Sequence, residues 1–277
     1  MIHLGLVGYP LEHSLSPKIH SAAFQSCGLE GDYSLFPISP DIKQGLEDLL
    51  ARVRSGEIAG LNVTIPHKQN VIPFLDELTP TAKAIGAVNT IYRVNHELIG
   101  DNTDASGFLF DLKRFLNTKT LRPVDLNALV LGAGGSARAV IYALLDDGWS
   151  VVVAARRIEE AQQLAELFLP RELLVMNYDS FDLEPYIFNL IVNTTPVGMT
   201  PNINQSPWPD GVQFPHQATV YDLVYNPRET KLVKDACAAG LSATTGLGML
   251  IEQAALSFEI WTGSNPSRNI LFESVNH

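Results

Sequence analysis

Short apolar runs alternate with segments of helical apolar spacing along the first part of the chain. The predicted strands are 4–7, 33–38 and 58–63, and the predicted helices are 17–27, 41–54 and 68–75. Residues 88–94 and 98–99 predict a hairpin that turns at Asn95-His96. Strands and helices that alternate in this way predict an α/β domain with a mostly parallel sheet.

The same alternation continues toward the C-terminus. The predicted strands are 128–131, 150–155, 173–176, 190–193 and 219–223, and the predicted helices are 105–116, 137–146, 159–168, 230–239 and 249–261. Asp104 and Ser16 stand where the helices 105–116 and 17–27 need N-caps. The polar segment 117–127 predicts a loop between two domains.

Composition narrows the classes of partner. The 277 residues suffice for one large or two ordinary domains, and an apolar fraction of 46% indicates a packed globular protein. Thirty acidic and nineteen basic residues give a formal net charge of −11, which argues against a general nucleic-acid or anionic-membrane surface. The electrostatic field of this negative net charge also opposes anionic ligands. Local hydrogen-bond donors must therefore hold any anion that binds.

Targeting and redox features are those of an intracellular protein. The N-terminal segment has no basic region followed by the apolar stretch of a signal peptide. No run reaches the roughly 18 apolar residues of a membrane-spanning helix. Cys27 and Cys237 lie far apart and are predicted to be reduced thiols. We therefore expect a soluble, cytoplasmic protein.

A glycine-rich turn lies between a predicted strand and a predicted helix. Its residues are Gly132, Ala133, Gly134, Gly135, Ser136 and Ala137. The first glycine permits a tight turn, the second lets the backbone approach a pyrophosphate, and a small residue at Ala137 allows close helix–strand packing. The free N–H groups of a helix N-terminus attract the anion. The order strand, turn, helix, strand predicts a dinucleotide site, and the alternative is a glycine-rich turn without a ligand.

The next strand ends in Arg156-Arg157, where an NAD site would place an acid for the ribose 2′-hydroxyl. Guanidinium groups suit a 2′-phosphate, which they bind in bidentate fashion. The pair therefore favours NADP over NAD. The alternative is two solvated arginines at a helix start, where positive charge is slightly unfavourable.

Polar residues follow the apolar runs in three further segments, 62–68, 86–90 and 100–104. Ligands of open α/β sheets bind outside the carboxyl ends of the strands, so we expect these polar side chains to converge. A protonated Lys68 beside a carbonyl oxygen would stabilise developing charge and deliver a proton, and Asp104 would orient the ammonium group. The alternative is a surface lysine and a capping aspartate. With a dinucleotide site, this crevice predicts hydride transfer involving a polyhydroxylated small molecule.

These segments together resemble the shikimate dehydrogenase family over essentially the whole chain. The resemblance is carried by Ser14-Leu15-Ser16-Pro17, Asn62-x-Thr64-x-Pro66-x-Lys68, Gly86-Ala87-x-Asn89-Thr90, Asn102-Thr103-Asp104, Gly132–Ala137, Asn193-x-Thr195, Tyr221-Asp222-x-x-Tyr225 and Gly246-x-Gly248-Met249-Leu250-x-x-Gln253. The resemblance implies reduction of 3-dehydroshikimate to shikimate with NADPH. It also implies a substrate domain of residues 1–104 plus 246–277, a Rossmann-like, doubly wound NADP-binding domain of residues 105–245, and a cleft between them.

The resemblance also implies roles for individual residues. Lys68 and Asp104 are the catalytic residues, and Ser14 and Ser16 hold the substrate carboxylate through hydroxyl donors and a helix N-terminus. The other implied substrate-binding residues are Thr64, Asn89, Tyr225 and Gln253. Cofactor contacts beyond the glycine-rich turn and the two arginines are implied for Thr195, Leu223, Gly246 and Met249. Tyr225 and Met249 suit packing roles equally well.

One position departs from the family pattern. The family often carries a second arginine where this chain has Glu160, which would repel a 2′-phosphate if it faced the site, and Arg157 is the candidate replacement. Three alternatives stay open: a quinate/shikimate dehydrogenase with relaxed substrate choice or NAD use, an enzyme of an aminoshikimate pathway, and a non-catalytic sensor of NADP or shikimate. Lys68 and Asp104 argue against the sensor, which needs no proton donor.

Metal and macromolecular partners are not expected. His13, His20, His67 and His96 lack ligand spacing with other candidate ligands, so we predict no metal and place each histidine in a loop or on a helix surface. We expect a small-molecule substrate, no nucleic acid and no membrane. The chain is expected to be a monomer or a homodimer.

Overall fold

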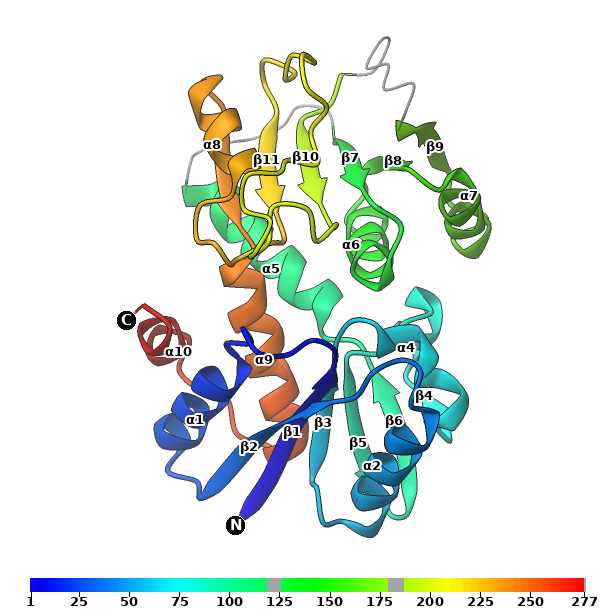
Figure 1. Ribbon diagram of the computed structural model, residues 1–277, viewed down its shortest axis with the longest axis vertical. Helices are drawn as coiled ribbons and strands as arrows, with labels where there is room; N and C mark the ends of the chain where they lie inside the picture. The colour runs from blue at the N-terminus through cyan, green and yellow to red at the C-terminus, as the bar shows by residue number, and fades with distance from the viewer. Residues whose placement is uncertain (119–125, 179–186, 277) are drawn as a thin grey trace. The chain divides into compact units, whose positions relative to one another are not determined.

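The computed structural model describes residues 1–118, 126–178 and 187–276, and these form two compact units. Unit 1 comprises Met1–Gly107 and Leu250–His277, and unit 2 comprises Phe108–Met249. Each unit has its own six-stranded sheet (Figure 1). Most of the predicted loop 117–127 lies outside the described residues.

The sheet of unit 1 has the strand order β2-β1-β3-β5-β6-β4. Its strands are β1 (Ile2–Gly8), β2 (Gly31–Pro37), β3 (Gly60–Val63), β4 (Glu77–Leu78), β5 (Thr90–Val94) and β6 (Glu97–Asp101). Of these six, β5 alone runs antiparallel to its neighbours. The mostly parallel sheet is thus confirmed. The hairpin between β5 and β6 is also confirmed, and Asn95 takes the left-handed conformation of its turn with φ of 57°.

The helices of unit 1 are α1 (Ser16–Cys27), α2 (Lys43–Ser55), α3 (His67–Asn70), the 3₁₀ turn η1 (Ile72–Phe74), α4 (Pro80–Ile85) and α10 (Arg268–Ser274). The predicted helix 68–75 is wrong as one element. Pro73, which has no N–H to donate, falls in this segment, and the chain forms α3 and η1 instead. Two more helices, α5 (Asp104–Thr118) and α9 (Leu247–Thr262), contribute residues to both units.

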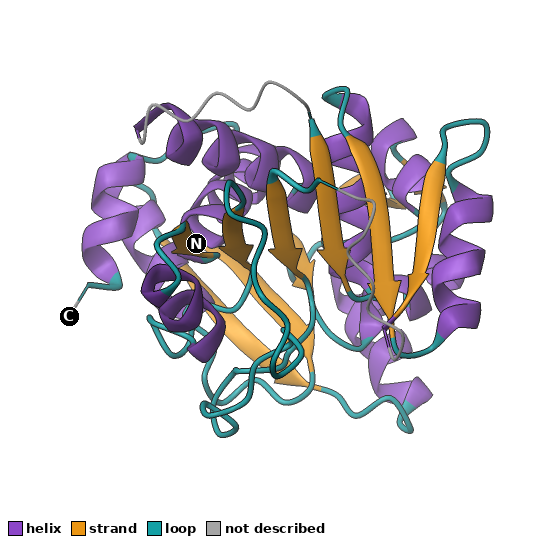
Figure 2. Ribbon diagram, turned by 90° about the horizontal axis from the view of Figure 1, so that it is seen from above, coloured by secondary structure: helices purple, strands orange, loops and turns teal. Residues whose placement is uncertain are grey.

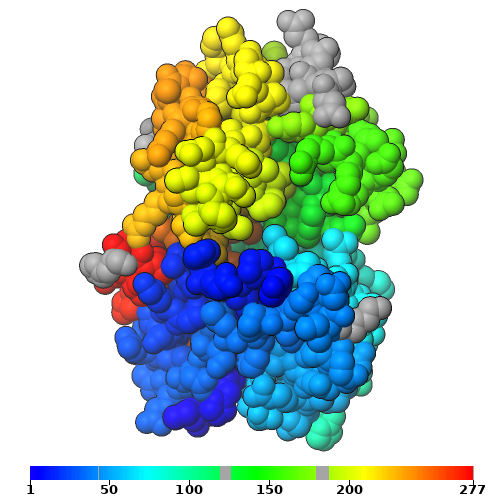
Figure 3. All heavy atoms as spheres, viewed as in Figure 1, coloured from blue at the N-terminus to red at the C-terminus, as the bar shows by residue number. Residues whose placement is uncertain are grey.

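Residues alternate between the two faces of the sheet of unit 1. Leu61 and Val63 of β3 point into a core that α2 completes with Leu50 and Val53. Asn62, between them, points to the opposite face. On that face α1 and α9 meet through an edge-to-face contact of Phe24 and Phe258, with ring centroids 5.0 Å apart. α10 packs against α1, as Figures 1 and 3 show.

Both predicted N-caps are wrong. Ser16 is the first residue of α1, and Ser14 Oγ accepts a hydrogen bond from its backbone N–H at 3.2 Å. Asp104 is likewise the first residue of α5, and Asn102 Oδ1 accepts from the N–H groups of Asp104 (3.1 Å) and Ala105 (3.4 Å). A side chain two residues earlier therefore caps each helix, which leaves the Asp104 carboxylate available for other partners.

Unit 2 is a doubly wound sheet whose strands all run parallel, in the order β12-β11-β10-β7-β8-β9. Figure 2 draws the strands in orange and the helices around them in purple. The strands are β7 (Asn127–Leu131), β8 (Ser150–Ala155), β9 (Leu173–Asn177), β10 (Leu190–Asn193), β11 (Thr219–Asp222) and β12 (Ser242–Thr245), and the helices are α6 (Gly135–Asp146), α7 (Ile158–Leu167) and α8 (Lys231–Ala238). The Rossmann-like order reverses between β7 and β10, and ligands bind at such a switch point.

Two of the histidines are buried, so the surface positions predicted for them are wrong. His67 Nε2 contacts the carbonyl oxygen of Ile38 at 2.6 Å. His20 is fully buried and stacks on Tyr33, with ring centroids 4.1 Å apart and an interplanar angle of 3°. Burial lowers the pKa of His20 from 6.5 to about 3, against a weaker raising effect of the Asn62 side chain. The native protein therefore keeps this imidazole neutral.

The low pKa of His20 predicts a specific acid sensitivity. Below pH 6.5 the unfolded chain binds a proton at His20, whereas the native chain binds it only near pH 3. The free energy of unfolding therefore falls as the pH drops. The contribution is at most about 1.4 kcal/mol per pH unit in this window. His20→Phe keeps an aromatic ring and should lose that part of the slope in urea unfolding measured from pH 7 to pH 4. An unchanged slope would contradict a neutral His20.

Candidate active site

A buried ion pair joins two segments that follow β3 and β6, whose carboxyl ends lie at the same edge of the sheet. Lys68 Nζ donates to Asp104 Oδ2 at 2.6 Å, and the side chains are 11% and 6% exposed. Lys68 comes from α3, whose position is fixed in part because the Lys68 carbonyl accepts from the Val88 N–H at 2.8 Å. Asp104 begins α5. Two segments distant in the sequence thus place a cation and an anion together where both side chains are largely shielded from solvent.

Asn89 holds the second oxygen of this carboxylate. Its Nδ2 donates to Asp104 Oδ1 at 2.9 Å and also lies 2.9 Å from Thr103 Oγ1, and its Oδ1 accepts from the Thr103 N–H at 2.8 Å. Each Asp104 oxygen therefore has its own donor, Lys68 on one side and Asn89 on the other. Lys68 and Asn89 together fix the plane of the Asp104 carboxylate. This plane determines the direction in which the carboxylate holds the Lys68 ammonium group.

Gln253 brings α9 to the same place. Asn89 Nδ2 lies 3.3 Å from Gln253 Oε1, and Gln253 Nε2 donates to the Leu250 carbonyl at 2.8 Å. The close approach of α5 to α9 requires Gly107, because a Cβ there would lie 2.8 Å from the Gln253 backbone nitrogen. The structure thus unites Lys68, Asn89, Asp104 and Gln253, all of them predicted site residues.

A network behind these residues was not predicted as part of the site. Asn62 Nδ2 donates to the Asn89 carbonyl (3.1 Å) and to Ser257 Oγ (3.0 Å). Ser257 Oγ also lies 2.7 Å from Thr90 Oγ1 and 3.1 Å from Thr103 Oγ1. The sequence held one signal for Ser257, since it follows Gln253 by four residues and so shares its face of α9.

The other predicted substrate residues lie at the ends of elements. Ser14 is partly exposed just before α1, Ser16 is buried in its first turn, and Thr64 is partly exposed directly after β3. Tyr225 belongs to unit 2, is partly exposed, and has the pKa of its phenol raised by burial. A hydroxyl with a raised pKa stays protonated near neutral pH and remains a hydrogen-bond donor.

Two glycines of the glycine-rich turn in unit 2 have different surroundings. Gly132 has φ of 109°, and a Cβ there would lie 2.7 Å from Thr194 Oγ1 and 2.9 Å from Thr195 Cγ2. Gly134 occupies the N-cap of α6, no side chain caps that helix, and a Cβ there would have no atom within 4 Å. Open space therefore lies above the backbone at the start of α6, an arrangement suited to a phosphate.

Arg156 and Arg157 lie beyond the end of β8, and both are exposed. Arg157 Nη2 pairs with Glu160 Oε1 at 2.9 Å, with the arginine side chain 76% exposed. Burial lowers the pKa of Arg138 in the first turn of α6, and the charge of Glu160 acts in the opposite direction. Glu160 thus lies close to arginines of both α6 and the β8–α7 connection. Because exposed ion pairs contribute only about 0.2–1 kcal/mol, Arg157 is free to exchange Glu160 for another anion.

A buried carboxylate organises the loops after β10 and β11. Asp222 Oδ1 accepts from Asn193 Nδ2 (2.8 Å) and the Val224 N–H (3.0 Å), and Oδ2 accepts from Thr230 Oγ1 (2.6 Å). Burial raises the pKa of Asp222 to about 6, although all three donors act to lower it. Asn193 Oδ1 in turn accepts from the Thr195 N–H at 2.9 Å. The Asp222 carboxylate therefore fixes the loop that carries Thr195.

The remaining predicted cofactor residues pack beside these loops. A Cβ on Gly246 would lie 2.3 Å from the Leu223 carbonyl oxygen, so only glycine allows this approach. Met249 is buried in the first turn of α9, where its backbone N–H bonds to the hydroxyl of Tyr221. Tyr221 donates to Asp111 Oδ2 at 2.6 Å. These contacts fix the start of α9 within unit 2.

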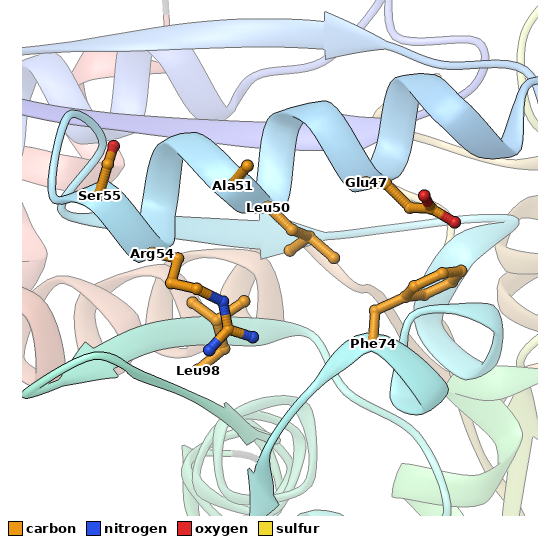
Figure 4. Close-up of a pocket in the computed structure, with 7 residues that line it drawn as sticks. All are labelled: Glu47, Leu50, Ala51, Arg54, Ser55, Phe74 and Leu98. Atoms are coloured by element: carbon orange, nitrogen blue, oxygen red, sulfur yellow. The ribbon is translucent and has the colours of Figure 1, made fainter.

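A separate surface groove borders α2 in unit 1 (Figure 4). Leu50, Phe74 and Leu98 supply its apolar part, and Arg54 donates to Asp76 Oδ2 (2.6 Å) and to the His96 carbonyl (2.9 Å). None of the predicted site residues lines it. The groove therefore does not compete with the Lys68–Asp104 region as the candidate site.

Neither a metal cluster nor a membrane span is present in the described part of the chain. Within 1–118, 126–178 and 187–276, no group of three or more His, Cys, Asp or Glu side chains could hold a metal ion. Across the same residues, every helix is too short or too polar to cross a membrane.

Comparison with known proteins is unambiguous. A family model for the shikimate dehydrogenase substrate binding domain matches residues 6–91, and one for the shikimate 5′-dehydrogenase C-terminal domain matches residues 246–270. Shikimate dehydrogenase (NADP+) of Methanococcus maripaludis strain C7 is 40% identical over 275 residues, which cover 99% of this chain and 95% of the relative.

Solved structures agree over the same length. Shikimate 5-dehydrogenase from Thermus thermophilus, in complex with NADP(H) and shikimate, matches with a TM-score of 0.85 at 38% identity and covers 99% of this chain and 98% of its own. Quinate dehydrogenase from Corynebacterium glutamicum, in complex with NAD, matches with a TM-score of 0.87 at 32% identity, again with 99% and 98% covered.

Proposed function

The chain belongs to the shikimate dehydrogenase family, and from that premise we propose that it interconverts 3-dehydroshikimate and shikimate with NADP(H). The observation that carries the proposal is the buried Lys68–Asp104 pair, with a distance of 2.6 Å and a carboxylate held on its other side by Asn89. Reduction of a ketone needs a positive charge and a proton beside the carbonyl oxygen, and this pair supplies both.

Lys68 is the proposed general acid in the direction of reduction. Its ammonium group donates a proton to the substrate oxygen as that oxygen becomes a hydroxyl, and the neutral amine takes the proton back in the reverse direction. Asp104 orients Lys68 and accepts a hydrogen bond from a substrate hydroxyl. When bound, NADPH supplies the hydride that reaches the carbonyl carbon.

Substrate binding is proposed for unit 1, together with Tyr225. Asn89 and Gln253 offer both donors and acceptors, as ring hydroxyls require, and Thr64 adds a hydroxyl. Ser14 and Ser16 would hold the carboxylate with hydroxyl groups at the start of α1. Such neutral donors bind an anion without a buried cation, which suits a chain with a net charge of −11.

Cofactor binding is proposed for unit 2. The open space above Gly134 and the start of α6, which no side chain caps, fit a pyrophosphate. The residues proposed to line the site are Gly132, Ala133, Gly134, Gly135, Ser136, Ala137, Arg156, Arg157, Thr195, Leu223, Gly246 and Met249. The boundaries 1–104 plus 246–277 and 105–245, a cytoplasmic location, and a monomer or homodimer remain proposals.

One observation favours relaxed cofactor choice as a second candidate. Arg157 is engaged by Glu160 at 2.9 Å, so one of the two guanidinium groups is partly neutralised. The similarity to a quinate dehydrogenase in complex with NAD points in the same direction. Some use of NAD, or of quinate, by the same site is compatible with these features.

Removal of the proposed acid should abolish turnover. Lys68→Ala is expected to lower kcat for shikimate oxidation by about 10²–10⁴-fold, the usual contribution of a positioned acid or base. Lys68→Arg keeps the ion pair but cannot release its proton, so it should be similarly inactive while it remains folded. Reduced-nicotinamide absorbance measures the rate, and Lys83→Ala, an exposed lysine of α4, is the control. Turnover that survives in both Lys68 variants would remove this assignment.

Arg156 should discriminate between the two nicotinamide cofactors. Arg156→Ala is expected to lower kcat/KM for NADP+ about tenfold or more and to leave kcat/KM for NAD+ nearly unchanged, because the lost guanidinium group would contact only the 2′-phosphate. Arg171→Ala, which removes an exposed cation of the same unit, is the control. Equal losses with both cofactors would refute the 2′-phosphate role of Arg156.

A further inference from the structure

We propose that Ser257 is a positioning residue that ties α9, the helix of Gln253, to Asn89, which holds the Asp104 carboxylate. The inference rests on the proposed function and extends it to a side chain outside the predicted site. Ser257 is fully buried and lies about one helical turn after Gln253, on the same face of α9. Its single hydroxyl group contacts polar groups of β3, of β5, of the residue before α5 and of α9 itself.

The Ser257 hydroxyl is a junction of hydrogen bonds from different elements. Its oxygen accepts from Asn62 Nδ2 at 3.0 Å, and it lies 2.7 Å from Thr90 Oγ1 and 3.1 Å from Thr103 Oγ1. It also lies 3.0 Å from the Gln253 carbonyl oxygen, to which it donates. A hydroxyl group offers one proton and two acceptor sites, so these contacts use its whole hydrogen-bonding capacity.

Thr90 and Thr103 connect Ser257 to the side chain of Asn89. Thr90 Oγ1 donates to Asn89 Oδ1 at 3.0 Å, and the Thr103 N–H donates to the same oxygen at 2.8 Å. Because these two donors hold the oxygen of the amide, its nitrogen is the end that donates to Asp104 Oδ1, at 2.9 Å. Ser257 is therefore two hydrogen bonds away from the atom that sets the orientation of the Asn89 amide.

Gln253 is held by the same hydroxyl groups through its main chain. Thr103 Oγ1 donates to the Gln253 carbonyl at 3.1 Å, beside the hydrogen bond that Ser257 makes to this oxygen. The side chain of Gln253 lies with Oε1 3.3 Å from Asn89 Nδ2. The hydroxyl of Ser257 thus helps to hold both amide side chains that are proposed to bind ring hydroxyls, although it does not itself contact the substrate.

A purely structural Ser257 makes a different prediction from a positioning one. If the residue only stabilises α9, Ser257→Ala lowers the fraction of folded enzyme, which lowers the apparent kcat and leaves KM for shikimate unchanged. If the hydroxyl positions Asn89 and Gln253, the same variant takes a buried partner from Asn62 and from Thr90. Both substrate-binding amides are then held less firmly, and KM for shikimate rises.

The test measures shikimate oxidation by Ser257→Ala and by Thr90→Val, which removes the linking hydroxyl and keeps the shape of the side chain. We expect KM for shikimate to rise about three- to tenfold in each variant, the size of one hydrogen bond of ordinary strength. KM for NADP+, which is proposed to bind to unit 2, should stay unchanged. Neither KM depends on the concentration of folded enzyme.

Thr262→Ala is the matched control. Thr262 is the last residue of α9, and its hydroxyl donates to the carbonyl four residues earlier, that of Phe258, at 2.8 Å. This bond has the same form as the one from Ser257 to Gln253, so the control removes a similar hydrogen bond from the same helix. Thr262→Ala should keep the wild-type KM for shikimate.

A double-mutant cycle supplies an independent readout. If Ser257 acts on Asn89 through Thr90, the rise in KM for Ser257→Ala/Thr90→Val should be smaller than the product of the two single rises. Multiplicative rises, or an unchanged KM for shikimate in Ser257→Ala, would overturn the role of Ser257 while the wild type remains active. A wild-type chain that oxidises no shikimate with either cofactor would instead contradict the proposed function, and the role of Ser257 with it.

Discussion

The ion pair between Lys68 and Asp104 is the interaction on which the rest of unit 1 depends. Two charges with side chains 11% and 6% exposed have lost most of their hydration, and such a pair is tolerated only when further hydrogen bonds compensate. Asn89 supplies one to the carboxylate, and Asn102 caps α5 in place of Asp104. The surrounding amides and hydroxyls are thus explained by what a buried ion pair requires.

A buried carboxylate that is held by several donors also organises unit 2, and there it belongs to Asp222. A carboxylate at the end of β11 collects three donors from separate segments and thereby sets the path of the loops beside the glycine-rich turn. In both units, polar groups at the carboxyl ends of strands are buried and almost fully satisfied. Such networks favour one arrangement of the side chains. A buried polar group that loses its hydrogen-bond partner destabilises the protein by more free energy than the hydrogen bond contributed. Tyr33 belongs to the network of unit 1, since its hydroxyl donates to Asn62 Oδ1 at 2.8 Å.

Local pattern predicted the alternation of elements, the hairpin at Asn95 and the glycine-rich turn, because periodicity and turn chemistry are local properties. It failed for the caps of α1 and α5, since Ser14 and Asn102 compete with Ser16 and Asp104 from two residues away. It also missed the burial of His20, which depends on Tyr33 and α9. It missed the role of Ser257 too, whose side-chain partners Thr90 and Thr103 lie more than a hundred and fifty residues away. Long-range contacts decide which polar residues enter a site, and one sequence does not contain them.

We propose that the charge of Asp104 makes Lys68 competent to exchange a proton with the substrate. The most direct measurement is kcat of Asp104→Asn for shikimate and NADP+, followed by reduced-nicotinamide absorbance, with thermal unfolding recorded to verify the fold. Asparagine keeps the shape of the side chain, removes its charge and replaces one acceptor oxygen with an NH2 donor, so it can no longer accept from both Lys68 and Asn89. We expect a loss of about a hundredfold or more. A variant that keeps kcat within about twofold of the wild type would contradict it.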